Sequence, residues 1–141
     1  MLMGLHLEFE VLGDNFSSAG TASEEVKRKL KHLGIGSEDV RRVAIAMYEG
    51  EMNMVIHAGG GRAIVDIYLD RIEIELVDKG AGIPDIELAM TPGYSTAKES
   101  VRCLGFGAGM GLPNMKKYTD KMEIQSVVGE GTTVKMTAFF H

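Results

Sequence analysis

Three polar residues recur at intervals of four in one segment of the sequence: Glu49, Asn53 and His57. If the segment is helical, this spacing places the three side chains on one face. An amide oxygen beside a carboxylate suits Mg²⁺, a hard cation that prefers oxygen ligands and keeps several waters. An ordinary solvated helix face has the same pattern, so the segment predicts a metal site only in combination with other features.

A second cluster, Asp78-Lys79-Gly80-Ala81-Gly82-Ile83, directly follows an apolar run that is typical of a strand. The glycines would let a flat ligand approach the backbone closely. The Asp78 carboxylate would be able to accept a hydrogen bond from an exocyclic amine. A simple strand-terminating turn has a similar composition, and this alternative stays open.

A third cluster, Gly105-Phe106-Gly107-Ala108-Gly109-Met110-Gly111, precedes a segment with helical character that begins at Leu112. Alternate glycines before a helix expose backbone N–H groups and the positive end of the helix dipole to a polyphosphate. A flexible surface loop is the alternative. The cluster does not follow a strand and lies in no βαβ unit, which argues against a dinucleotide-binding fold, and the P-loop pattern is absent.

These clusters lie among segments whose apolar periodicity indicates regular structure. We expect helices from Ser18 to His32, ended by Gly34, and from a capping Ser37 to about His57, then Ile86 to Met90 and Leu112 to Tyr118. We expect strands at Leu5–Leu12, Ala63–Leu69, Ile72–Val77, Met122–Val128 and Thr133–Phe140, with Asp70-Arg71 as a tight turn. This order predicts an α+β two-layer sandwich, with a mixed, largely antiparallel sheet covered on one face by helices.

Composition narrows the functional classes. The 141 residues suffice for one domain, which we place at residues 1–141, and their net charge of −5 argues against broad nucleic-acid binding. No apolar run reaches the roughly 20 residues that span a bilayer, so we expect no membrane segment. The single cysteine, Cys103, excludes an internal disulfide and fits the cytoplasm. The ten methionines are most simply core residues, although a methionine-rich partner surface is an alternative.

The order of the motifs resembles that of the GHKL ATPases, which include gyrase, the heat-shock chaperone and sensor histidine kinases. The motifs that carry this resemblance cover nearly the whole chain. They are an Asn-bearing helix, then D-x-G-x-G-I, then alternating glycines before a helix, and finally Gly129-Glu130-Gly131-Thr132-Thr133 in a hairpin. Within that group the chain is most similar to the small bacterial serine/threonine kinases that regulate sigma factors and stress responses. The stretches from Pro84 to Thr96 and from Gly109 to Pro113 carry this closer resemblance.

The resemblance implies a Bergerat-type fold that binds ATP and Mg²⁺. It implies that Asn53 ligates Mg²⁺, that Glu49 is the catalytic general base, and that Asp78 binds the adenine amine. It implies further nucleotide-binding positions, which are Gly80, Gly82 (making room for the base), Ile83, Gly105, Gly107, Ala108, Gly109, Met110, Gly111, Leu112 and Thr132 (acting through a water). A lid from about Thr91 to Ala108 would cover the phosphates.

The implied activity is transfer of the ATP γ-phosphate to a Ser or Thr of a small, anti-sigma-antagonist-like regulator, with a sigma factor as a further partner. One departure bears on it: related kinases carry an Arg near the position of Gly107, so Lys98 or Arg102 would have to supply the charge at the γ-phosphate. Two alternatives remain, an ATP-dependent binding module without kinase activity and an ATP-binding subunit of another enzyme. At this length we expect no transducer or phosphoacceptor domain. The oligomeric state stays open, a homodimer included.

Overall fold

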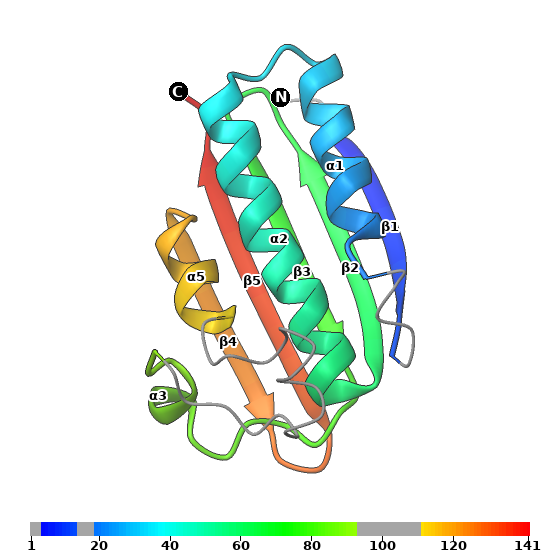
Figure 1. The fold of residues 1–141 in the computed structure, drawn as a ribbon, viewed down its shortest axis with the longest axis vertical. Coiled ribbons are helices and arrows are strands. Elements are labelled where there is room, and N and C mark those ends of the chain that lie inside the picture. Colours follow the sequence, from blue (N-terminus) through cyan, green and yellow to red (C-terminus); the bar gives the residue numbers. More distant parts are fainter. Residues whose placement is uncertain (1–3, 14–18, 93–110) are drawn as a thin grey trace.

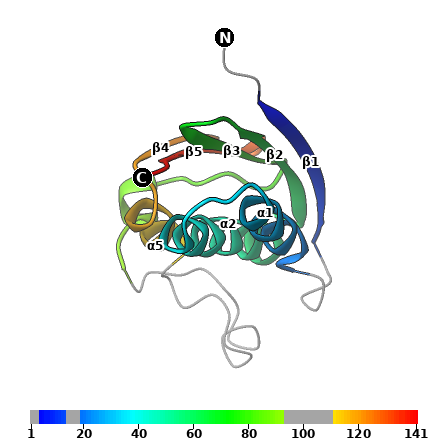
Figure 2. The same cartoon turned by 90° about the horizontal axis from the view of Figure 1, so that it is seen from above.

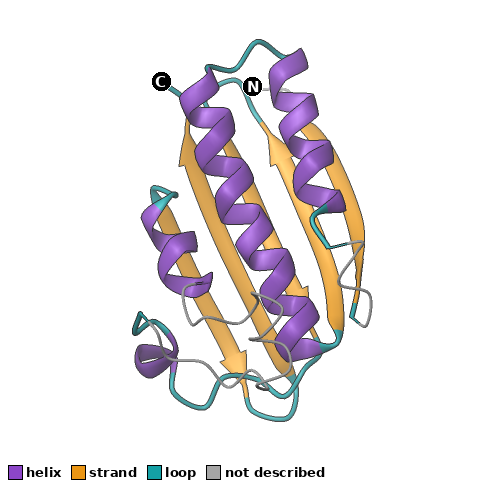
Figure 3. Ribbon diagram, in the orientation of Figure 1, coloured by secondary structure: helices purple, strands orange, loops and turns teal. Residues whose placement is uncertain are grey.

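The computed structural model describes residues 4–13, 19–92 and 111–141, which form one layer of strands and one layer of helices (Figures 1 and 3). In chain order the elements are β1 (Leu5–Leu12), α1 (Thr21–His32), α2 (Ser37–Ala58), β2 (Gly60–Ile67), β3 (Arg71–Asp78), α3 (Ile86–Ala89), α5 (Gly111–Lys117), β4 (Lys121–Val127) and β5 (Gly131–Phe139). Seen from above, α1, α2 and α5 lie together on one face of the sheet, which confirms the expected α+β sandwich (Figure 2). Within the described ranges, no helix has the length and apolar character needed to cross a membrane.

The five strands are ordered β1-β2-β3-β5-β4, so the last strand of the chain lies between β3 and β4. All four described pairings are antiparallel, and none of the parallel pairs that a mixed sheet would contain occurs among them. Two cross-strand partners matter for the site: Asp78 pairs with Thr132, and Thr132 pairs with Ser126. The ends of three neighbouring strands are thereby brought together.

The core lies between the two layers and follows from the periodicity of the sequence. Alternate residues of β2, β3 and β5 point toward the helices, and the apolar stripes of α1 and α2 pack on them. Fully buried members include Val26, Leu30, Val43, Met47, Val65, Ile72 and Met136. Four of the ten methionines lie in this core (Met47, Met54, Met115 and Met136) and Met52 is also buried, in agreement with their expected role as core residues.

The start of α1 differs from the sequence prediction. The helix begins at Thr21, after Gly20, and not at Ser18, which lies outside the described residues. Gly20 has φ = 95°, a left-handed conformation that the interior of a right-handed helix cannot contain. The helix is capped instead by Glu51 of α2, whose buried carboxylate accepts the backbone N–H of Ser23 at 2.5 Å.

Several other boundaries differ from the prediction by one to three residues; β2, for example, begins at Gly60 and not at Ala63. Gly36, not Ser37, is the N-cap of α2, and no side-chain capping bond is formed there. The β2–β3 turn is centred on Leu69-Asp70 and not on Asp70-Arg71, because Arg71 is already a strand residue. The backbone N–H of Tyr68 donates to the carbonyl of Arg71 at 2.8 Å and closes this turn.

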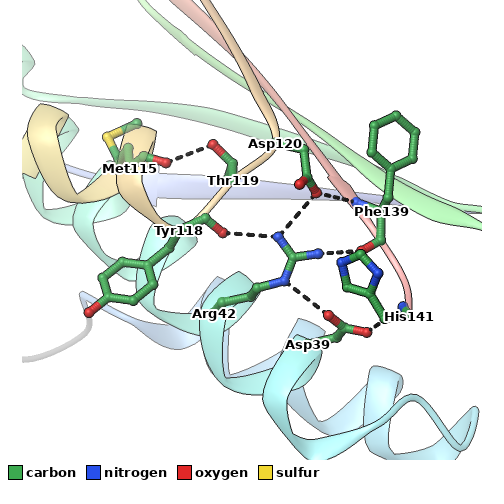
Figure 4. A network of polar contacts seen from close by, with 8 residues as sticks. All are labelled: Asp39, Arg42, Met115, Tyr118, Thr119, Asp120, Phe139 and His141. Atoms are coloured by element: carbon green, nitrogen blue, oxygen red, sulfur yellow. Dashed lines mark hydrogen bonds and ion pairs between the residues drawn. The ribbon is translucent and has the colours of Figure 1, made fainter.

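The end of the sheet at which β5 finishes is tied to the start of α2 by Arg42 (Figure 4). The guanidinium donates to Asp39 at 3.0 Å and to Asp120 at 3.1 Å, and it also bonds the carbonyl of Phe139. Asp39 in turn accepts the backbone N–H of His141 at 2.8 Å. These contacts hold the final residues of the chain against the helical layer, at the end of α2 opposite Asn53.

Candidate functional site

Glu49 and Asn53 lie one turn apart on α2, and both side chains are half-buried. His57 follows at the next turn with an exposed side chain. The first residue of α5, Gly111, lies against the first two: a Cβ atom at this glycine would be 3.2 Å from Oδ1 of Asn53 and 3.7 Å from Oε2 of Glu49. The structure therefore brings the end of the glycine cluster 105–111 to the polar face of α2.

The Asp78 carboxylate organises the loop that follows β3. Its Oδ1 accepts the backbone N–H of Gly80 at 2.9 Å and that of Thr132 at 3.2 Å. Both bonds use the same oxygen, and the described residues place no hydrogen-bond donor on Oδ2. One carboxylate oxygen of Asp78 thus shapes the loop, which leaves the other as an acceptor for a ligand.

Ser126 of β4 connects this loop to the β4–β5 hairpin. Its hydroxyl accepts the backbone N–H of Ile83 at 2.7 Å and lies 2.8 Å from the hydroxyl of Thr132. Thr132 is 8% exposed, so its hydroxyl needs a polar partner, and Ser126 supplies one. Sequence reasoning did not identify Ser126. The available signal was its place opposite Thr132 across the Gly129–Gly131 hairpin.

The glycines of this loop also have packing roles. A Cβ atom on Gly80 would lie 2.7 Å from Cα of Ala58, so the loop presses against the last turn of α2. Gly82 has φ = 81°, and a Cβ atom there would lie 2.6 Å from the carbonyl oxygen of Val127. The space beside Gly82 in that direction is filled by the hairpin backbone. Its proposed role in admitting the adenine base stays a prediction.

The remaining predicted positions divide into two groups. Leu112 is 6% exposed and belongs to the core, and Ile83 is partly buried and packs against the core, so the nucleotide contact expected of both stays a prediction. The others lie outside the described residues: Gly105, Gly107, Ala108, Gly109 and Met110, the lid from residue 93 onward, and the candidate cations Lys98 and Arg102.

The oxygen atoms on α2 fit a magnesium ion that is bound mainly by a nucleotide. Among the described residues no group of three or more His, Cys, Asp or Glu side chains forms a metal cage. Mg²⁺ in nucleotide sites typically takes only one or two protein oxygens, with phosphate oxygens and waters completing its octahedron. The amide oxygen of Asn53, with Glu49 one turn away, meets that requirement.

Known proteins resemble this chain in sequence. A family profile described as a histidine kinase-like ATPase domain matches residues 15–138. The serine/threonine-protein kinase RsbT of Bacillus subtilis is 36% identical over 109 residues, which cover 74% of this chain and 76% of RsbT. An anti-sigma F factor of Caldanaerobacter subterraneus is 37% identical over 107 residues, with coverages of 72% and 71%.

A solved structure shows the same fold. The crystal structure of the RsbU and RsbW domains of Rv1364c from Mycobacterium tuberculosis superimposes with a TM-score of 0.63 at 16% identity. The match covers 98% of this chain and 32% of that longer one. The family profile and the two relatives, together with the shared fold, show that the chain belongs to the histidine kinase-like ATPase domain family.

Proposed function

We propose that the protein binds Mg·ATP and transfers the γ-phosphate to a Ser or Thr of a small regulatory protein of the anti-sigma-antagonist type. The observation that carries this proposal is the approach of Gly111 to Asn53 and Glu49. This approach brings the end of a glycine-rich segment, of a kind that binds phosphates, next to the Asn53 amide that would ligate the metal and next to the Glu49 carboxylate. The names of the relatives, a serine/threonine kinase and an anti-sigma factor, support the activity and this kind of partner. A sigma factor as second partner, and the cytoplasm as the place of action, belong to the same proposal.

Each residue has a chemical role in this proposal. Asn53 ligates Mg²⁺, which neutralises charge on the phosphates as the γ-phosphoryl group is transferred. Glu49 accepts the proton of the partner's hydroxyl while that oxygen bonds to phosphorus and ADP leaves. Asp78 accepts a hydrogen bond from the adenine amine through Oδ2, and Thr132 supports the base through a water. Ser126 holds the Thr132 hydroxyl in place.

A second candidate is an ATP-dependent binding module that sequesters its partner without chemistry. It is favoured by the relatives that are named anti-sigma F factors. The two candidates differ in whether a cation reaches the γ-phosphate, and the two residues proposed for this, Lys98 and Arg102, lie outside the described residues. A transfer assay separates them.

The test uses radiolabelled Mg·ATP and small regulators encoded near this gene, with wild type, Glu49→Ala and Asn53→Ala. A general base acts in the transition state and contributes little to ground-state binding, so Glu49→Ala should bind Mg·ATP almost normally. Its transfer rate should fall by about 10²–10⁴-fold. Asn53→Ala should lose the Mg²⁺-dependent part of ATP affinity. Glu38→Ala, an exposed glutamate in the first turn of the same helix, is the matched control.

Two results would overturn parts of this proposal, and only the second decides against a kinase. Wild-type transfer by Glu49→Ala would remove the base assignment. A wild type that binds a regulator in the presence of ATP, yet transfers no phosphate to it, would establish the binding module.

A further inference from the structure

A groove of about 500 Å³ is lined by residues of α1, of α2 and of the connection between them. Ser37 lines it, together with four apolar residues that we call its floor: Ile35, Val40, Ala44 and Ile45. Val40 is buried, and the other three are half-buried. We call this feature the α1–α2 groove. Apolar side chains left partly open along a pair of helices are typical of surfaces that receive a helix from another protein.

The rim of the α1–α2 groove carries positive charge. Lys27 and Lys31 line it from α1, Arg41 lines it from α2, and the described lining residues include no carboxylate. Within residues 4–13, 19–92 and 111–141 the structure contains no ion pair for these three cations. The positive rim stands out because the protein as a whole carries a net charge of −5.

The basic surface continues from Arg41 onto the end of α5. The Arg41 guanidinium lies 5.9 Å from the centre of the Tyr118 ring, and the Lys117 ammonium lies 5.3 Å from the same ring. A carboxylate-rich segment that leaves the groove past Arg41 would meet one further cation, Lys117, and the aromatic face of Tyr118.

The floor is pre-organised by the way in which α1 ends. Gly34 has φ = 78°, its N–H donates to the carbonyl of Lys31 at 3.1 Å, and the N–H of Ile35 donates to the carbonyl of Leu30 at 3.1 Å. This pair of bonds is a Schellman motif, which folds the residue after the glycine back onto the helix. Ile35 is therefore held at the floor by the backbone, and a partner would not have to order it.

We propose that the α1–α2 groove binds an acidic amphipathic helix of a partner protein. The apolar floor would receive side chains at i, i+3, i+4 and i+7, and the basic rim would receive Asp or Glu beside them. The floor is lined by aliphatic side chains, whereas nucleic-acid surfaces use aromatic side chains for stacking, and this favours a protein. Arg41 and Asn53 are twelve residues apart on α2, about 18 Å along the helix axis, so the basic rim is distant from the proposed metal ligand, while the floor residue Ile45 lies one turn before Glu49.

The test measures direct binding of a fluorescent designed helix of about 18 residues, with Leu at the groove-facing positions and Glu beside them. Two control peptides carry Lys in place of every Glu, or Gln in place of every Leu. The protein is used as wild type, as the double variant Lys27→Glu/Lys31→Glu, as Ala44→Gln, which fills the floor, and as Lys29→Glu. Lys29 lies on the same helix but does not line the groove.

We expect the acidic peptide to bind wild type and Lys29→Glu equally, without ATP, and more weakly as salt rises. The double variant should lose about tenfold in affinity or more, because reversal replaces two attractions with two repulsions. Ala44→Gln should also weaken binding, because it occupies the floor. Amide shifts on titration should fall on α1 and the first half of α2. All variants should keep wild-type ATP affinity, which shows that they are folded.

The proposal is overturned if the acidic peptide does not bind, if the basic peptide binds equally well, or if the double variant binds like wild type. Stronger binding of anionic vesicles or RNA, abolished by the same double variant, would also overturn it. The inference does not rest on phosphoryl transfer, because the peptide assay contains no ATP. If the protein is a kinase that docks its substrate here, the double variant should additionally raise KM for that protein and leave kcat unchanged.

Discussion

The buried carboxylate of Glu51 lies 2.5 Å from the backbone nitrogen of Ser23, so a side chain of α2 caps the N-terminus of α1. The same carboxylate accepts the N–H groups of Gly20 at 3.0 Å and Ala22 at 3.2 Å. Gly20, at the N-cap position, has no side chain to perform this role. Three backbone donors at the start of one helix therefore depend on one residue of its neighbour.

Removing that carboxylate should destabilise the whole domain. Glu51→Ala leaves buried N–H groups without an acceptor and should lower the free energy of unfolding by about 3–5 kcal/mol, measured by urea denaturation. Glu24→Ala is the control, because Glu24 is exposed in the first turn of the same helix and should contribute less than about 1 kcal/mol. Equal losses in the two variants would show that Glu51 does not act as a cap.

Asp78→Asn should separate ATP binding from folding. The amide oxygen can still accept from Gly80 and Thr132, so the loop should persist. Loss of the charged acceptor should weaken the affinity for ATP by about ten- to 150-fold, measured by calorimetry. Asp85→Asn is matched to it, because Asn is an equally good cap at this N-cap of α3. Unchanged ATP affinity in Asp78→Asn would remove the adenine assignment.

Gly111→Ala tests the contact between α5 and the polar face of α2. A methyl group 3.2 Å from Oδ1 of Asn53 would push that side chain by a few tenths of an ångström. Mg·ATP affinity should fall about three- to tenfold, while stability is retained or rises, because Ala favours a helix by about 1 kcal/mol over Gly. Gly36→Ala, at a glycine with no atoms near the Cβ position and φ = −59°, should leave affinity unchanged. Equal affinity in both variants would mean that Asn53 does not hold the metal.

Stability should depend on pH through Asp39. Burial alone would raise the pKa of Asp39, but the N–H of His141 and the Arg42 guanidinium outweigh burial and lower this pKa below its ordinary value of 3.8. A carboxyl with a lowered pKa in the folded state stabilises the fold above its unfolded pKa. That stabilisation is lost as the pH falls through the folded value.

The variant Asp39→Asn reveals this contribution. At pH 7 it should reduce the free energy of unfolding by about 1–3 kcal/mol, since it removes a charged acceptor that is 4% exposed. The difference from wild type should shrink once the pH falls below about 4. Urea denaturation of both proteins between neutral and acidic pH measures it. A difference that stays constant over this range would show that the carboxylate charge contributes nothing.

Much of the local structure follows from the sequence alone. Alternation in β1 and β3, and the stripe that contains Val40, Val43 and Met47, are local properties of the chain and predicted the elements within a few residues. Gly34 marked the end of α1, because a left-handed residue is required there and glycine adopts that conformation without strain. The order of the polar and glycine clusters was enough to identify the family, which the comparisons confirm.

Tertiary structure decided the contacts that join segments distant in sequence. The insertion of β5 between β3 and β4 places Thr132 beside both Asp78 and Ser126, and no periodicity encodes that pairing. In the sequence Glu51 is one of several polar residues of α2, and only the packing of α1 beside α2 gives it the role of a helix cap. The α1–α2 groove likewise exists only because the packing of α1 beside α2 brings Lys27 and Arg41 to one pocket. Local patterns report which face of an element is apolar, whereas a carboxylate's partners are set by long-range geometry, which only the folded chain defines.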